Sequence, residues 1–189
     1  MGVLARWTDL LDDALPGEHL VQLFRREEFL AEAVTVFAGA GLKRGDAVIL
    51  VATPVHVEAF CRELAAAGHD VEQARRWGQL FVVDAATLLS RLTTGAGLDG
   101  AAFAAIVGEL VERARAGSSR RDVRVFGEMV DLLWKRDLAA AVQLEQLWNE
   151  LIESQPVSLL CSYHLADGDT ETAFPPPLCR AHTRLVPES

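Results

Sequence analysis

The sequence lacks the features that would place it outside the cytoplasm. It has three cysteines in 189 residues, an odd number spread through an apolar chain, which favours reduced thiols over a disulfide framework. No window approaches the ~20 consecutive apolar residues that a membrane-spanning helix needs. The N-terminus has the pattern of neither a signal peptide nor a membrane anchor. We therefore expect a cytoplasmic protein without a membrane partner.

Basic charge is also scarce. The chain has 18 lysines and arginines against 27 aspartates and glutamates, which gives a formal net charge of −9 and a sequence pI of about 5.0. Such a chain is poorly suited to neutralise phosphates, so we do not expect nucleic acid as a partner. One group of arginines stands out, and we interpret it as a solvated helix end and loop: Arg113, Arg115, Arg120, Arg121 and Arg124.

The chain does have enough apolar residues for one folded domain. Half of its residues are hydrophobic, and its mean hydropathy is +0.17. A chain of this length and composition fits one globular domain with a sizeable core. We divide it into an acidic amphipathic extension, residues 1–17, and a domain, residues 18–187, which shows no internal repeat and no dividing linker.

Strand-like and helix-like segments alternate along this domain. Their apolar periodicity predicts strands at 19–24, 47–52, 79–83, 123–126 and 157–163. Helices are predicted at 27–40, 55–67, 71–77, 85–92, 101–116, 128–135 and 138–153, with Gly41 ending the first, a loop at 93–100 and a break at 117–119. This alternation predicts a three-layer α/β fold, in which helices cover both faces of a mainly parallel sheet.

Glycine is missing from the one loop where a nucleotide-binding domain needs it. The strand at 47–52 runs through Thr53 directly into Pro54, Val55, His56 and Val57. A phosphate-binding loop needs glycines that turn several backbone N–H groups inward, and a Lys-Ser/Thr pair for phosphate and Mg²⁺. Proline instead removes an N–H at the corner. The sequence therefore predicts the scaffold of a nucleotide-binding domain whose phosphate site has been replaced, and it disfavours an ATPase.

Ligands of open α/β sheets bind beyond the carboxyl ends of the strands, so residues at those ends are candidates. Glu128 follows the predicted strand 123–126. It has two interpretations: an acidic residue that positions metal or water in a nucleotide hydrolase, or a carboxylate that favours the first turn of the next helix. Trp148 fits core packing, with a pocket wall as the alternative. Glu145 and Asn149, four residues apart, are expected to hydrogen-bond each other or a backbone terminus.

A C-x-x-H pattern, Cys179 to His182, follows Cys161 and His164 in the sequence. A metal site needs about four ligands, usually at short and regular spacings. One C-x-x-H beside scattered cysteines is a weak signal, and buried thiols beside a hydrogen-bonded histidine are the commoner outcome. We therefore predict no metal ligand and no cofactor.

Five segments together resemble one family, the MEDS domain, or methanogen/methylotroph DcmR sensory domain, across about residues 18–187: 41–56, 125–134, 144–149, 159–163 and 178–182. The resemblance implies a RecA/KaiC-like fold without a working phosphate loop. It also implies a role in sensing small molecules such as simple hydrocarbon derivatives, in partnership with histidine kinases or DNA-binding regulators. The family's signature positions correspond here to His19, His56, Gly127, Glu128, Trp134, Glu145, Trp148, Asn149, Cys161, Tyr163, Cys179 and His182.

From these observations we expect a stand-alone sensory domain, not an enzyme, that binds a small, largely apolar molecule. Its output would pass to a sensor histidine kinase, an anti-sigma factor or a transcription regulator. We assign structural roles to Gly127, Glu145, Trp148, Asn149, Cys179 and His182. One pocket is expected to hold the ligand-binding residues, His19, His56, Glu128, Trp134, Cys161 and Tyr163.

Two alternatives remain open from the sequence. One is a ligand-free interaction module of a kinase or anti-sigma pathway, which includes assembly as a homodimer. The other is a protein that retains some nucleotide binding or hydrolysis through Glu128.

Overall fold

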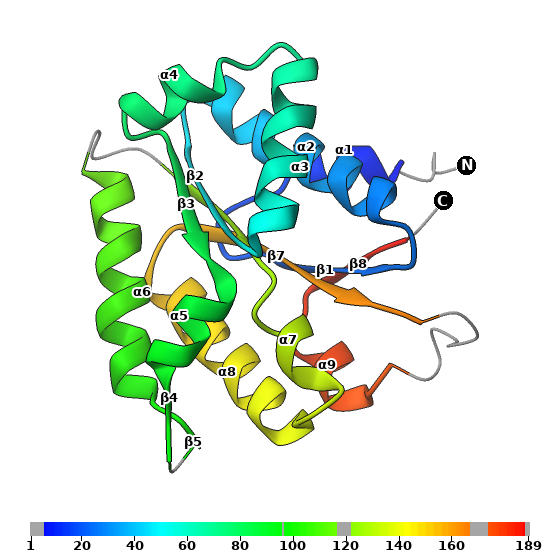
Figure 1. Cartoon of the computed structure of the whole chain (residues 1–189), viewed down its shortest axis with the longest axis vertical. Helices are drawn as coiled ribbons and strands as arrows, with labels where there is room; N and C mark the ends of the chain where they lie inside the picture. The colour runs from blue at the N-terminus through cyan, green and yellow to red at the C-terminus, as the bar shows by residue number, and fades with distance from the viewer. Residues whose placement is uncertain (1–5, 96, 117–121, 167–173, 188–189) are drawn as a thin grey trace.

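The structure is a computed structural model that describes residues 6–95, 97–116, 122–166 and 174–187. Its centre is a six-stranded sheet with the order β3-β2-β6-β7-β1-β8, and the strand pairings in this sheet are parallel. Figure 1 shows this sheet crossing the middle of the molecule. Its strands are β1 (His19–Phe24), β2 (Ala47–Ala52), β3 (Leu80–Asp84), β6 (Val123–Gly127), β7 (Val157–His164) and β8 (Arg184–Val186).

Helices cover both faces of the sheet (Figure 1). One face packs against α1 (Trp7–Asp12), α2 (Glu27–Arg44), α3 (Pro54–Ala66) and α4 (Val71–Arg76). The other packs against α5 (Ala85–Leu92), α6 (Gly100–Arg115), α7 (Asp131–Trp134), α8 (Leu138–Ser154) and α9 (Pro176–Arg180). The predicted three-layer α/β fold with a parallel sheet is thus confirmed. In the described part of the chain, none of these helices has the length and apolar character to cross a membrane.

The central strand β2 shows why the sequence forms this architecture. All six of its residues are buried. Val48, Leu50 and Ala52 join the core beneath α2 and α3, whereas Ile49 and Val51 join the core on the opposite face. Because successive side chains of a strand point to opposite faces, a strand covered on both sides must be apolar throughout. The predicted bounds of this strand, 47–52, agree with the structure for this reason.

The prediction that Gly41 ends the first helix was wrong. Helix α2 continues through Gly41 to Arg44, and it ends at Gly45, whose φ of 85° is the left-handed conformation favoured by glycine. A Cβ atom on Gly41 would lie 2.8 Å from Cδ of Arg124. Glycine is therefore needed at position 41 because the Arg124 side chain passes close to the helix backbone, and it does not act as a stop signal.

Arg124 itself was wrongly interpreted as part of a solvated group. Its side chain is buried beneath α2, with a residue exposure of 2%. It lies 3.5 Å from Asp46, and its guanidinium donates hydrogen bonds to four backbone carbonyl oxygens, those of Leu11, Asp12, Ala14 and Phe37. A buried guanidinium is tolerated when its donors are paired in this way, and here the pairing attaches the N-terminal segment to the domain. Arg120, Arg121 and the predicted break at 117–119 lie outside the described residues.

Two other predicted segments differ from the structure. The helix expected at 128–135 is reduced to the single turn of α7, because Glu128 turns back to the edge of the sheet instead of beginning a helix. The loop expected at 93–100 contains a small antiparallel pair, β4 (Thr93–Thr94) and β5 (Gly97–Leu98). Both differences arise from side-chain or backbone pairing that a local pattern does not show.

Candidate functional site

The carboxyl ends of β2 and β6 lie side by side, because these two strands are paired. From β2 the chain passes through α3 and α4 to the outer strand β3, and it returns through α5 and α6 to β6 on the other side of β2. Such a reversal of strand order opens a crevice beyond the strand ends, which is the usual ligand site of open α/β sheets. Thr53 and Glu128 flank this position, and His56 follows in the first turn of α3.

Glu128 closes the corner between β2 and α3. One of its carboxylate oxygens accepts a hydrogen bond from the Thr53 N–H at 2.9 Å, and the other lies 2.9 Å from Nδ1 of His56. Nε2 of His56 lies 2.7 Å from a carboxylate oxygen of Glu27, and the ring stacks on Phe60. The contact with Glu128 raises the pKa of His56 to about 9, although burial opposes the shift. The anion at this corner is thus a carboxylate of the protein itself.

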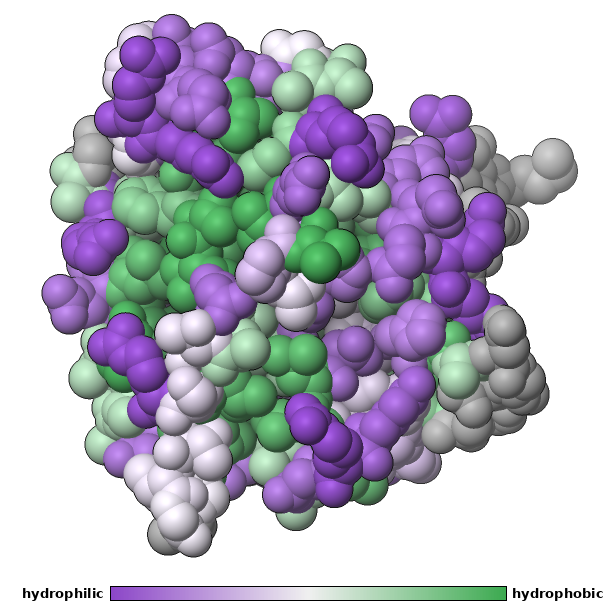
Figure 2. All heavy atoms as spheres, in the orientation of Figure 1, coloured by the Kyte–Doolittle hydropathy of each residue, from purple (hydrophilic) through white to green (hydrophobic). Residues whose placement is uncertain are grey.

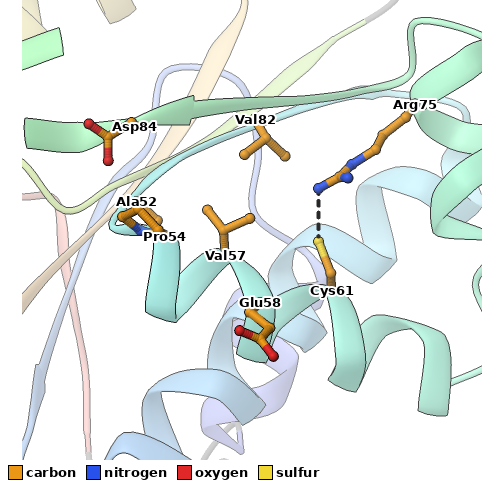
Figure 3. Close-up of a pocket in the computed structure, with 8 residues that line it drawn as sticks. All are labelled: Ala52, Pro54, Val57, Glu58, Cys61, Arg75, Val82 and Asp84. Carbon is orange, nitrogen blue, oxygen red and sulfur yellow. Dashed lines mark hydrogen bonds between the residues drawn. The ribbon is translucent and has the colours of Figure 1, made fainter. Parts of the chain in front are cut away.

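A pocket of about 440 Å³ lies beside this corner, between α3, α4 and the outer strand β3. In Figure 3, Val57 and Val82 point toward each other across it, and Arg75 reaches the Cys61 thiol at 3.3 Å. Burial raises the pKa of that thiol despite the nearby guanidinium. Figure 2 shows hydrophobic residues gathered over this part of the surface. The full lining is Ala52, Pro54, Val57, Glu58, Cys61, Arg75, Val82 and Asp84.

A second polar group is buried on the opposite face of the sheet, beneath α8. Nε2 of His19 lies 3.3 Å from both Sγ of Cys161 and Oε2 of Glu145, and Nε2 of His182 lies 3.1 Å from Oε1 of Glu145. The Tyr163 hydroxyl donates to the same carboxylate. Burial alone would raise the pKa of the Glu145 carboxyl, but the contacts with His182 and His19 outweigh it and hold that pKa below its usual range. We call His19, Glu145, Cys161 and His182 the buried cluster.

The structure divides the six predicted ligand-binding residues between these two places. His56 and Glu128 meet at the corner, whereas His19, Cys161 and Tyr163 meet beneath α8. Trp134 packs edge-on against the Tyr163 ring, with 5.9 Å between ring centroids. The prediction that one pocket holds all six residues was therefore wrong, and none of the six lines the pocket beside α3. Alternation along β1 and β7 accounts for this, because it turns His19, Cys161 and Tyr163 toward the face opposite α3.

The residues to which we assigned structural roles lie in two places, the core around Trp148 and the surroundings of the buried cluster. Trp148 is completely buried, and Gly127 lies beside it in the core. Of the two expectations for Asn149, the bond to a backbone terminus is the one observed: its amide donates to the carbonyl oxygen of Ala181, at the end of α9. Its side-chain oxygen lies 2.9 Å from Nδ1 of His19.

Sequence reasoning missed two features of this arrangement. It did not identify the pocket lining around Cys61 and Arg75, because the lining joins three elements that only the fold brings together. It also assigned Glu145 and His182 structural roles and Cys161 a ligand-binding role, although the three residues lie together in the buried cluster. Cys179 of the C-x-x-H pattern is exposed and is not part of that cluster. The family's signature positions include all four cluster residues, but their sequence separations exceed those of short metal-binding motifs.

Comparison with solved structures gives the same fold. A KaiC-like protein from the hyperthermophilic archaeon Pyrococcus horikoshii OT3 matches with a TM-score of 0.60 at 13% sequence identity, and the match covers 92% of this chain and 75% of that chain. At this identity the likeness shows a KaiC-like RecA fold and nothing beyond it. Comparison with curated protein sequences gave no match.

The family comparison is more specific. The MEDS family, the methanogen/methylotroph DcmR sensory domain, matches residues 18–176, which is most of the chain. This match includes the corner at Thr53 and Glu128, the pocket beside α3, and three of the four cluster residues. A chain with this fold and this match belongs to the MEDS family of sensory domains.

Proposed function

We propose that this sensory domain binds a small, largely apolar molecule in the pocket between α3, α4 and β3, and that binding regulates a partner protein. The observation that carries the proposal is the pocket itself, because it combines apolar walls with a few polar groups. Ligand sites commonly have volumes of about 300–1,000 Å³ and a predominantly apolar lining. The charged lining residues of this pocket are one arginine, Arg75, and two acids, Glu58 and Asp84, so the pocket suits a small uncharged molecule better than a nucleoside triphosphate with its anionic chain.

The apolar contacts would come from Ala52, Pro54, Val57 and Val82, which lie on the wall shared by β2, α3 and β3 (Figure 3). Polar groups stand at the margins of this wall. Arg75 is already paired with the Cys61 thiol, and Asp84 caps α5 by accepting the Thr87 N–H. These groups can orient a ligand that has one polar atom, but they do not form the cluster of donors that a phosphate requires.

The corner at Glu128 supports the same function. In an active phosphate site, backbone N–H groups of the corner point at the ligand. Here the Thr53 N–H already donates to Glu128, and Pro54 has no N–H. Nδ1 of His56 contacts the same carboxylate. Replacement of the phosphate by an internal carboxylate favours a sensory role over nucleotide hydrolysis.

A route for signal transmission is the first turn of α3, which joins the pocket to the corner. Pro54 and Val57 line the pocket and flank His56 in the first turn of α3. A ligand that pushes on this turn changes the contact between His56 and Glu128, and thereby the position of the segment after β6. Val55, in the same turn and 75% exposed, offers an apolar contact to a kinase, an anti-sigma factor or a transcription regulator.

Thermal melting with a panel of small alcohols, halocarbons and methylated amines tests the proposal. At least one compound is expected to raise the melting temperature of the wild-type protein, because a ligand that binds only the folded form stabilises it. Val57→Trp fills the pocket and should abolish that shift. Val142→Trp, at a half-buried valine on α8 away from the pocket, is the matched control and should keep it.

Two results would reject the proposal. One is the absence of any shift across the panel for the wild-type protein. The other is an equal shift in the folded Val57→Trp variant, which would place binding elsewhere. A ligand-free interaction module predicts the first result together with stable self-association, which light scattering after size exclusion detects.

A further inference from the structure

The buried cluster has no part in the proposed pocket, yet it brings together four side chains that commonly bind metals. His19 begins β1, Glu145 lies in α8, Cys161 lies in β7, and His182 follows α9. One nitrogen, oxygen or sulfur atom from each lies within 4.8 Å of all the others. The side chains of His19, His182 and Glu145 are 0–1% exposed. Such an arrangement of polar atoms in a protein core requires a physical reason.

The two histidine rings are held with the same nitrogen facing inward. Nδ1 of His19 lies 2.9 Å from the side-chain oxygen of Asn149, and Nδ1 of His182 lies 2.7 Å from the backbone oxygen of Leu178. Asn149 is oriented by its own amide, which donates to Ala181. Carbonyl oxygens only accept hydrogen bonds, so Nδ1 carries a proton in both rings, and Nε2 is the ring atom that faces the cluster. Metal-binding histidines are typically held in this way.

Both Nε2 atoms face the Glu145 carboxylate. Nε2 of His182 has no hydrogen-bond partner of suitable geometry among the described residues, although Oε1 of Glu145 lies 3.1 Å away. The same oxygen already accepts the Tyr163 hydroxyl. Two ring nitrogens, a carboxylate and a thiol thus converge on one place, and a metal ion that binds there replaces the protons that these groups share.

Four separations within the buried cluster lie close to those of a tetrahedral site. Metal–ligand bonds of about 2.0–2.3 Å place the corners of a tetrahedron about 3.3–3.8 Å apart. Here His19 Nε2 lies 3.3 Å from the Cys161 sulfur, and Oε2 of Glu145 lies 3.3 Å from His19 Nε2 and 3.8 Å from that sulfur. His182 Nε2 lies 3.1 Å from the other carboxylate oxygen, Oε1.

We propose that His19, Glu145, Cys161 and His182 bind one divalent transition-metal ion, with Zn²⁺ as the best fit. Two imidazole nitrogens, one sulfur and one carboxylate oxygen form the mixed N/S/O donor set that suits Zn²⁺, whereas Mg²⁺ and Ca²⁺ prefer oxygen ligands. A thiolate and a carboxylate also balance the charge of a divalent ion in the core.

This ion has a structural role. All four coordination positions come from protein side chains, which is typical of a closed structural site rather than a catalytic one. The ion links β1, β7 and α8 to the segment that holds His182, and that segment leads into β8 beside β1. It therefore fastens the C-terminal end of the chain to the sheet.

Metal analysis of the untagged full-length protein tests the proposal. After reconstitution with Zn²⁺ and removal of loosely bound metal, elemental analysis should find about one zinc ion per chain. Replacement by Co²⁺ should produce intense thiolate-to-cobalt absorption in the near ultraviolet, together with the strong visible bands of tetrahedral cobalt. Because this spectrum is recorded on the wild-type protein, it does not depend on whether a variant folds.

Three variants assign the site. Cys161→Ser and His182→Gln should each reduce the bound zinc at least tenfold, and Cys161→Ser should also remove the thiolate absorption. Cys179→Ser, at the exposed cysteine near His182, is the matched control and should retain one zinc ion. The proposal is overturned if the wild-type protein binds neither ion, or if the folded Cys161→Ser variant keeps the metal and the cobalt spectrum.

Discussion

Glu128 and Glu145 are both carboxylates in contact with histidines, but their surroundings differ. Glu145 is completely buried, and its partners come from β1, β7 and the segment after α9. Glu128 lies at the carboxyl edge of the sheet. Its own side chain is also buried, at 4% exposed, but its partner His56 has an 18% exposed side chain. His56 in turn contacts Glu27, whose side chain is 60% exposed.

This difference separates a fixed part of the molecule from one that can respond. The Glu145 contacts fasten distant elements together, so a change there disturbs the whole fold. The Glu128 contacts lie within one corner beside the pocket and reach solvent through His56 and Glu27, so they can rearrange more easily than those of Glu145. A sensory domain needs both properties, because the ligand must move something while the rest of the scaffold stays in place.

The largest loss of folding stability is expected from a substitution in the core near Glu145. Trp148→Ala removes a completely buried side chain that packs edge-on against Phe103, with 5.0 Å between ring centroids. The free energy of unfolding should fall by about 3–5 kcal/mol, because the change leaves a large cavity. Denaturant unfolding measures it. Trp77→Ala, at a 71% exposed tryptophan, is the control and should change stability by less than about 0.5 kcal/mol.

Glu145→Gln should have the next largest effect. The substitution keeps the shape of the side chain but removes the charge that His19, His182 and Tyr163 face. Loss of one partner from a buried charged group costs about 3 kcal/mol. Glu150→Gln, at an exposed position of the same helix, should change stability by no more than about 0.5 kcal/mol. Equal results from these two variants in denaturant unfolding would contradict the contrast between the two carboxylates.

The corner should make stability depend on pH in the alkaline range. The pKa of His56 is raised to about 9 in the folded protein from an ordinary 6.5. Below pH 6.5 both the folded and unfolded forms are protonated, so the stabilisation is fully present. As the pH rises toward 9 the folded form holds the extra proton, and the stabilisation is lost. We expect a loss of about 1–2 kcal/mol, because solvent screens the contacts.

Unfolding of the wild-type protein and of His56→Gln at pH 6 and pH 9.5 isolates this contribution. At pH 6 the wild-type protein should be more stable than the variant by about 1–2 kcal/mol, and at pH 9.5 this difference should be close to zero. A difference that stays constant over this range would show that His56 does not stabilise the corner through its charge.

Glu128→Gln should have the smallest effect on stability, no more than the His56 charge contributes, which is about 1–2 kcal/mol. A glutamine oxygen can still accept the Thr53 N–H, and only the charge opposite His56 is lost. The ligand response should nevertheless change, because the corner is expected to transmit the signal. The melting shift with a compound from the panel, compared between the variant and the wild-type protein, measures this. Destabilisation as large as that of Trp148→Ala would contradict the division between fixed and responsive parts.

The sequence was sufficient for the fold where burial dictates residue type. The strand at 47–52 was placed correctly because a doubly covered strand must be apolar, and the helix at 85–92 has its predicted bounds. Proline at position 54 also predicted a changed phosphate corner. Each of these features follows from a local sequence pattern that is compatible with only one backbone structure.

The remaining features depend on contacts between distant residues. Gly41 has the pattern of a helix stop, and only the position of Arg124 shows that it provides space. Glu128 precedes an apolar stretch typical of a helix, but its hydrogen bond to Thr53 competes with helix formation. The buried cluster joins residues from almost both ends of the domain, so no spacing rule could have found it.

Amide chemical shifts of the isotope-labelled protein test the central claim most directly, that the domain binds a small apolar molecule beside a corner closed by its own carboxylate. Titration with the compound that gives the largest melting shift should move the amide signals of Val57 and Val82 most, and Mg²⁺-ATP should move none at Thr53 or Glu128. The opposite pattern, with no change at the pocket and clear nucleotide-induced changes at the corner, would contradict the account.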